Sequence, residues 1–101
     1  MNKLTAVCIV AIGLSVAPGV YAGDAAAGKE KSQSCVSCHG VNGRSNNPDN
    51  PNLAGQKKNY LITAIKAYKT GERKDPMMNT LVGGLSDADI ENLAEFYSSV
   101  K

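Results

Sequence analysis

Apolar and polar positions recur with helical spacing in two stretches of the chain. In the first stretch, apolar residues three and four positions apart share one face and polar residues share the other. The apolar face consists of Tyr60, Leu61, Ala64, Ile65 and Tyr68. Gly71 follows, and a glycine just past the last periodic residue is typical of a helix end. This stretch predicts an amphipathic helix whose apolar side covers something.

The second periodic stretch lies at the carboxyl end of the chain. Ser86 and Asp89 have the spacing of a capping box, which predicts that a helix begins at Ser86. Its expected buried stripe is Ile90, Leu93, Ala94, Tyr97 and Val100. Aspartates near its start suit the helix dipole. The simplest interpretation of this stripe is ordinary core packing.

The rest of the chain predicts one further helix and two long loops. Asp24 is a plausible N-cap for a helix that runs toward Cys38. Residues 40–55 are rich in Gly, Asn, Pro and Ser, which favours a wrapping loop. Residues 72–78 are also expected to form a loop, in which Pro76 fixes its own φ. Because no stretch alternates apolar with polar residues over a strand length, the predicted fold class is all-α.

The first 22 residues have the pattern of an export signal. Lys3 precedes an apolar run, and small residues at positions 20 and 22 suit a signal peptidase. We therefore predict a signal peptide over residues 1–22, cleavage after Ala22, a single domain over residues 23–101 and a periplasmic location. An uncleaved membrane anchor is the alternative. It is disfavoured because Pro18 interrupts the run, which falls short of about 20 apolar residues.

Composition limits what the remaining domain can be. It is poor in bulky apolar side chains, since residues 23–101 contain only 18 Leu, Ile, Val, Met, Phe and Tyr. Domains of this size are marginal unless a disulfide, a metal or another group supplements the core. The chain holds 11 Lys and Arg against 9 Asp and Glu, interspersed and without a basic block. We therefore expect an apolar non-protein group in the middle and no nucleic-acid partner.

The most informative segment is Cys35-Val36-Ser37-Cys38-His39, because CxxCH is the attachment sequence for c-type haem. Residues three and four apart on a helix share a face, so both thiols can reach the haem while His39 turns toward the iron. Three alternatives compete. A bare disulfide leaves His39 unused, a thioredoxin-like dithiol expects a βαβ unit, and a zinc site needs a fourth ligand. The segment favours covalent haem c, one per chain.

Four segments in order carry a more specific resemblance. They are CVSCHGVNG (35–43), NPNLAGQ (50–56), ERKDPMM (72–78) and LSDADIENLAEFY (85–97). With them, the domain resembles a class I c-type cytochrome of the small bacterial monohaem branch. The resemblance implies helices wrapped around one haem, attached through Cys35 and Cys38. It also implies a close contact between Gly28 and Tyr97 where the first and last helices cross. At Lys31 and Ser32 the chain departs from the bulky apolar residue usual in such proteins.

The resemblance also implies the iron ligands. His39 is one axial ligand, and a methionine before the final helix is the other. Relatives place that methionine seven residues before the Leu that opens the Leu-Ser helix start, which is Leu85 here, so the count selects Met78. Met77 is the alternative, and either methionine can instead fill a gap in the core.

Less direct roles follow from the same resemblance. The backbone carbonyl of Pro51 is expected to accept a hydrogen bond from the His39 ring, as carbonyls do for metal-bound imidazoles. Tyr60 and Arg73 suit hydrogen bonds to the haem propionates. Equally simple interpretations are a core position for Tyr60 and an exposed one for Arg73.

The implied function is one-electron transfer, outer-sphere, through an exposed haem edge. It is that of a carrier rather than an enzyme, because His and Met ligation leaves no position for a substrate. Expected partners are redox proteins such as a membrane oxidase or reductase complex, bound transiently. Lys57, Lys58, Val41 and Met77 are candidate docking residues. The alternatives are a haem enzyme or gas sensor whose methionine dissociates, and a bound subunit of a larger oxidoreductase.

Overall fold

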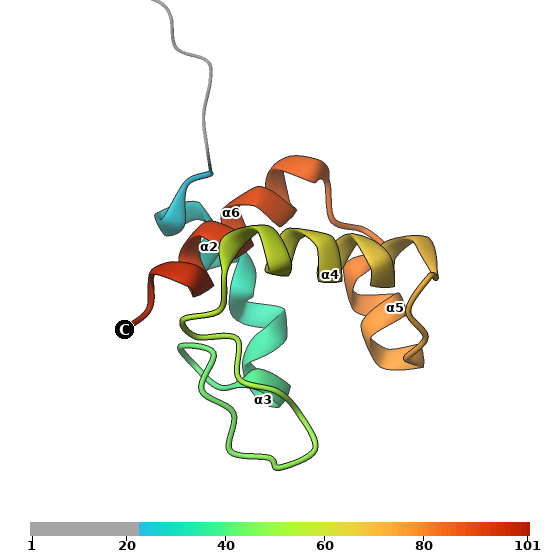
Figure 1. Ribbon diagram of the computed structural model, residues 1–101, viewed down its shortest axis with the longest axis horizontal. Coiled ribbons are helices and arrows are strands. Elements are labelled where there is room, and N and C mark those ends of the chain that lie inside the picture. Colours follow the sequence, from blue (N-terminus) through green and yellow to red (C-terminus); the bar gives the residue numbers. More distant parts are fainter. Residues whose placement is uncertain (1–22) are drawn as a thin grey trace, which may run out of the picture.

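The computed structural model describes residues 23–101, and the predicted signal peptide lies outside them. In Figure 1 the labelled helices follow in chain order, and a 3-10 turn, η2, links the first two. The bounds are α2 Ala25–Lys31, η2 Ser32–Cys35, α3 Val36–His39, α4 Lys58–Thr70, α5 Pro76–Val82 and α6 Asp87–Ser99. Within residues 23–101 there is no strand. The predicted all-α class is confirmed.

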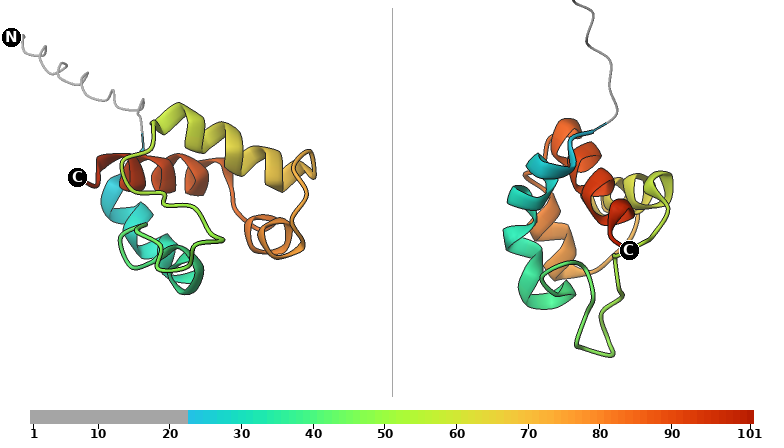
Figure 2. Two further views of the ribbon diagram at one scale, coloured as in Figure 1. Left: turned by 60° about the horizontal axis from the view of Figure 1, so that its bottom comes forward. Right: turned by 90° about the vertical axis from the view of Figure 1, so that its left-hand side faces the viewer.

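Two helix contacts organise the fold, and a third extends it. Helix α2 packs on α6, and α4 packs on α6 from another side. Helix α5 packs against α4 and lies at the far end of α4 from the α2–α6 crossing (Figures 1 and 2). The buried cluster between α4 and α6 comprises Leu61, Leu93, Ala94, Phe96 and Tyr97. Helix α5 is therefore joined to the core mainly through α4.

The crossing of α2 and α6 depends on Gly28, but its neighbour is not the one expected. A Cβ on Gly28 would lie 1.9 Å from the carbonyl oxygen of Asn92 and 2.9 Å from Cβ of Phe96. No atom of Tyr97, the expected neighbour, is among the three nearest to that position. Successive residues of a helix point about 100° apart, so α6 presents the Asn92 and Phe96 side to Gly28. Tyr97 instead lies against Gly43 in the loop.

The first helix begins as predicted but is not regular throughout. The Asp24 carboxylate accepts hydrogen bonds from the N–H groups of Ala26 and Ala27. The predicted run toward Cys38 is interrupted by η2, where the chain tightens before α3. Ser32, at the position where the sequence departs from its resemblance, is only 2% exposed, and its hydroxyl donates to the carbonyl of Lys29 at 2.6 Å. A small side chain therefore lies buried close to the crossing.

The prediction of a loop over residues 72–78 is wrong at its end. Helix α5 begins at Pro76, with Asp75 as its N-cap. The Asp75 carboxylate accepts hydrogen bonds from the N–H groups of Met77 and Met78 at 3.0 and 3.1 Å. Proline fits the first helical position because its missing N–H has no partner there anyway. Both methionines thus lie in the first turn of a helix.

The ends of the two longer helices follow the sequence signals. Gly71 ends α4 in the left-handed conformation, with a φ of 85°. Ser86 and Asp89 form the predicted capping box of α6, each accepting a backbone N–H of the other at 3.0 Å. In the part of the chain from Gly23 onward, no helix has both the length and the apolar character to span a membrane.

Candidate cofactor site

A cavity of about 310 Å³ lies between the helices and the loop after α3. Its polar and sulfur-bearing lining includes Cys35, Cys38, His39, Met77 and Met78. Most of the remaining wall is apolar and comes from α4, α5 and α6. Those apolar members include Leu61, Ala64 and Ile65 of α4, Val82 of α5 and Leu93 of α6, and Leu85 joins them from the turn between α5 and α6. The amphipathic face predicted for the α4 stretch therefore covers this cavity.

Cys35, Cys38 and His39 enter the cavity from η2 and the short helix α3. Both thiols are free, and His39 is 7% exposed. Nδ1 of His39 lies 2.8 Å from the carbonyl oxygen of Pro51. A ring N–H that donates to this carbonyl leaves Nε2 with its lone pair for a metal, as in most protein histidine ligands. Pro51 thus stands where its proposed role requires.

The loop after α3 is fastened to the CxxCH segment by contacts that the sequence analysis missed. The carbonyl of Cys38 accepts hydrogen bonds from the Asn50 amide at 3.0 Å and from the Ser45 hydroxyl at 3.3 Å. The N–H of Ser45 donates to the Asn52 side chain at 2.6 Å. Turn-forming Ser and Asn residues were noted only as loop composition. Their spacing from the motif gave no signal of which carbonyl they bind.

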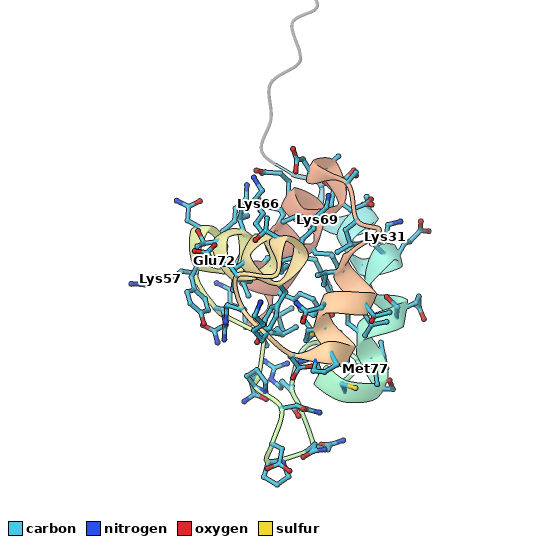
Figure 3. The ribbon with its side chains drawn as sticks, turned by 90° about the vertical axis from the view of Figure 1, so that its right-hand side faces the viewer. Lys31, Lys57, Lys66, Lys69, Glu72 and Met77 are labelled. Carbon is cyan, nitrogen blue, oxygen red and sulfur yellow. The ribbon has the colours of Figure 1, made fainter. Side chains whose placement is uncertain are left out.

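The two candidate methionines differ in exposure. Met78 is half-buried, whereas Met77 is 60% exposed and lies at the surface in Figure 3. Both border the cavity. A ligand that must hold an iron away from water is better supplied by the more buried side chain. The structure therefore favours the same residue as the spacing from Leu85.

Tyr60 and Arg73 both border the cavity but are held differently. Tyr60 is 51% exposed. The guanidinium of Arg73 lies 4.6 Å from the centre of the Tyr68 ring, within the range of a cation–π contact. Stacking on Tyr68 orients the guanidinium at the cavity rim. Both residues therefore stand where they can reach an acidic group at the edge of a bound cofactor.

Burial changes the pKa values of the groups at the Cys35 end of the cavity. Burial away from water raises the pKa of the Cys35 thiol. Burial also raises the pKa of Tyr97. The Tyr97 hydroxyl faces Ser32 and Cys35, yet it has no hydrogen-bond partner in the described chain. The Cys35 thiol is therefore neutral near pH 7 before any attachment.

The donors present fit a covalently attached haem. Two thiols three residues apart, one imidazole and the thioethers of Met77 and Met78 border one largely apolar cavity. A zinc site finds less support, because residues 23–101 contain no cluster of three or more His, Cys, Asp and Glu side chains that could hold a metal ion. A βαβ unit for a thioredoxin-like dithiol is ruled out by the all-helical fold of those residues.

One candidate docking residue is engaged elsewhere. Lys58 Nζ lies 3.1 Å from Glu95 and 3.6 Å from Glu91 on α6. These carboxylates raise the pKa of Lys58, Glu95 first through its hydrogen bond. Lys58 therefore joins α4 to α6 instead of facing a partner. Lys57, Val41 and Met77 remain exposed.

Comparisons with known proteins agree with this site. The family model described as cytochrome c matches residues 25–101. Cytochrome c-554(548) of Halomonas halodenitrificans is 49% identical over 81 residues, covering 77% of this chain and 98% of that protein. Cytochrome c4 of Pseudomonas aeruginosa is 40% identical over 101 residues, covering all of this chain and 50% of that protein. The chain thus spans about half the length of that relative.

Structural comparison gives the same result. The crystal structure of reduced recombinant cytochrome c4 from Pseudomonas stutzeri matches with a TM-score of 0.76 and 40% sequence identity, over 79% of this chain and 47% of that one. The family model covers nearly all of the described residues. The predicted class I cytochrome c fold and its haem c cofactor, bound covalently, are confirmed at the level of the family. The chain belongs to the cytochrome c family, whose members are electron carriers.

Proposed function

We propose that this chain is a one-electron carrier in which His39 and Met78 are the two axial ligands of a haem iron and Cys35 and Cys38 hold the haem by thioether links. The observation that carries the proposal is that all four side chains border one largely apolar cavity. The cysteines and His39 come from one arm of the chain and Met78 from another. The bound haem supplies a reversible one-electron couple.

The surrounding residues orient the proposed iron ligand His39 and keep water away from the haem. The Pro51 carbonyl fixes the His39 ring, and the apolar walls exclude water. With protein ligands on both sides, no position is left for a substrate, which favours a carrier over an enzyme. Methionine ligation also raises the reduction potential relative to two nitrogen ligands. Tyr60 and Arg73 are proposed to bind the propionates at the cavity rim.

The ligand assignment is tested by comparing Met78→Ala with Met77→Ala in the purified haem protein. Ferric haem with a sulfur ligand has a charge-transfer band in the far red. We expect Met78→Ala to abolish this band and lower the potential, because the sixth ligand is lost. Met77→Ala, which removes an exposed neighbour in the same turn, serves as the matched control and should change neither. Retention of the band in Met78→Ala would disprove the assignment.

We further propose that the chain is exported and that residues 1–22 are removed. The lysine, apolar run and small residues at that end support this. Mass spectrometry of the haem protein from the periplasmic fraction should show a chain that begins at Gly23 plus one haem. An intact residue 1 in the purified haem protein would contradict it.

We propose that the partners are redox proteins, such as a membrane oxidase or reductase complex, bound weakly through a small interface. Met77 and Leu81 are exposed apolar side chains that border the cavity, and Val41 is also exposed. Lys57 at the N-cap of α4 and Lys66 within α4 are exposed as well (Figure 3). One relative, 30% identical over 102 residues, is named thiosulfate dehydrogenase electron acceptor. Electron transfer to an acidic partner should therefore slow as salt increases. A rate independent of salt would contradict docking through these lysines.

A further inference from the structure

We propose that Asn79 is a positioning residue that holds Met78 against the iron, so that this asparagine decides how often the methionine ligand dissociates. The inference rests on the proposed ligation by Met78 and extends it to a residue that does not touch the cofactor. Asn79 follows Met78 in the chain and is half-buried, and it is not part of the cavity lining.

The Asn79 side chain ties together three parts of the Met78 region. Its amide nitrogen donates to the carbonyl of Tyr68 at 2.7 Å and to the carbonyl of Arg73 at 2.9 Å. Its amide oxygen accepts the N–H of Asp75 at 2.9 Å. Both ends of the amide are therefore used. One side chain joins the last turn of α4, the connecting loop and the N-cap of α5.

This arrangement bears on Met78 through Asp75. The Asp75 carboxylate holds the N–H of Met78, while Asn79 holds the N–H of Asp75. Asp75, which caps the helical turn that contains Met78, is thus itself held by Asn79. Among helix contacts, α5 packs chiefly on α4, so few other contacts hold this turn. Loss of the Asn79 amide should therefore let the turn move away from the cavity while the rest of the fold persists.

Movement of the Met78 turn away from the cavity can be measured by imidazole binding. Exogenous imidazole binds ferric haem at the position that the methionine leaves, so its apparent affinity is proportional to the fraction of molecules with the methionine dissociated. Two or three hydrogen bonds contribute net energies that together correspond to a change of between about tenfold and a hundredfold in that fraction. We expect Asn79→Ala to bind imidazole more tightly by about this factor. Its far-red band should also disappear on heating before the helices unfold.

Asn92→Ala is the matched control. Asn92 is also a half-buried asparagine outside the cavity lining, and its amide oxygen accepts the N–H of Asp24 at 2.8 Å. This bond joins α6 to the start of α2, far from the α5 end of the molecule (Figure 1). We expect Asn92→Ala to lower the stability of the fold and to leave imidazole affinity within about twofold of the unmodified protein.

Asn79→Asp separates hydrogen bonding from packing. Aspartate has nearly the same shape, but it replaces the donating nitrogen with an oxygen that faces the carbonyls of Tyr68 and Arg73. The imidazole affinity should rise at least as much as in Asn79→Ala. If Asn79→Ala does not accumulate as a haem protein, Asn79→Ser carries the same prediction, because its hydroxyl is too short to reach both carbonyls.

The outcomes are distinct. An unchanged imidazole affinity in Asn79→Ala, or an equal rise in Asn79→Ala and Asn92→Ala, overturns the role of Asn79. If Met78→Ala loses the far-red band under the same conditions, Met78 is still the ligand, and either of these results overturns only the role of Asn79. If Met78→Ala keeps the band, the ligand assignment itself fails, whatever Asn79→Ala does.

Discussion

The two proposed axial ligands lie in parts of the molecule that are held in contrasting ways. The arm that carries His39, residues 35–55, is bound into the core by side-chain and backbone contacts at many points. The arm that carries Met78, residues 71–82, follows the end of α4 and packs mainly on that helix. The left view of Figure 2 shows the two arms at opposite ends of the fold.

On the histidine side, the loop is fastened to α6 as well as to the CxxCH segment. The N–H of Gly55 donates to the carbonyl of Tyr97, and those of Leu53 and Ala54 donate to the carbonyl of Gly43. The ring of Tyr97 lies against Gly43 and is 1% exposed. Movement of His39 would therefore disturb the buried core.

On the methionine side, the contacts are fewer and more local. Leu81 is 38% exposed and Met77 is 60% exposed, so much of α5 faces solvent. Val82 is the buried residue of that helix. Regions with few buried contacts open at lower free energy than the whole protein. We infer from this difference that loss of the histidine ligand requires unfolding of the core, whereas loss of the methionine ligand requires only a local opening of the Met78 arm.

The largest effect is expected where the core is tightest, at Gly28→Ala. Its Cβ would meet the Asn92 carbonyl oxygen at 1.9 Å, and backbone cannot retreat as a flexible side chain can. We expect a loss of about 3 kcal/mol or more in the free energy of unfolding. Denaturant titration of the haem protein measures it. A loss below about 1 kcal/mol would show that α2 and α6 can separate freely.

A pair of glycine variants compares the two arms directly. Gly43→Ala would force a residue with a φ of 82° to carry a Cβ 2.7 Å from the Tyr97 ring, whereas Gly71, with a φ of 85°, has nothing within 4 Å. Gly71→Ala therefore reports backbone strain alone, about 1 kcal/mol, and Gly43→Ala should cost about 2 kcal/mol more. Equal losses in denaturant titrations would contradict the tighter packing of the histidine arm.

The methionine arm should respond locally to Asp75→Ala. The variant removes the N-cap from α5 and thereby frees the N–H groups of Met77 and Met78. Loss of such a cap costs about 1 kcal/mol. We expect imidazole to bind the ferric protein about fivefold more tightly, with a smaller change in the midpoint of global unfolding. A larger effect on global unfolding than on imidazole binding would refute the separation of the two arms.

Sequence patterns predicted the histidine side better than the methionine side. The CxxCH segment and the periodic faces of α4 and α6 are local signals, and their helices were correctly predicted. The start of α5 is not predicted, because Pro76 suits a loop as well as a first helical position. Yet Asp75 followed by Pro76 has the pattern of an N-cap and a first helical position, which could have shown it.

Other features depend on packing that no local pattern encodes. The face of α6 that meets Gly28 is decided by the rotation of one helix on another, so Tyr97 was assigned in place of Asn92 and Phe96. The bonds from Asn79 to Tyr68 and Arg73 cross between separate elements and have no sequence motif. The site's ligands were thus predictable by resemblance, whereas the residues that position them were not.

Within the histidine side, the ring of Tyr97 should matter and its hydroxyl should not. The hydroxyl is buried without a hydrogen-bond partner, so Tyr97→Phe removes an unsatisfied group and keeps the ring. We expect the free energy of unfolding to stay the same or rise by up to about 1 kcal/mol. Tyr97→Leu, which also removes the ring beside Gly43, should destabilise the protein. A clear loss in Tyr97→Phe would show that the hydroxyl forms a bond after all, with Ser32 or the Cys35 sulfur.

The capping box at the start of α6, outside both arms, should give the smallest and most pH-dependent effect. The backbone N–H of Ser86, and then the charge of Lys31, hold the pKa of Asp89 below its ordinary value of 3.8. A carboxylate with a depressed folded-state pKa contributes stability above its unfolded-state pKa and loses it as pH falls through the folded-state pKa. Asp89→Asn should therefore destabilise the protein by less than about 1 kcal/mol at pH 7, and the difference from the unmodified protein should shrink below about pH 4. Denaturant titrations from pH 3 to pH 7 measure it, and a difference that stays constant with pH would assign the contribution of Asp89 to the shape of the capping box instead of its charge.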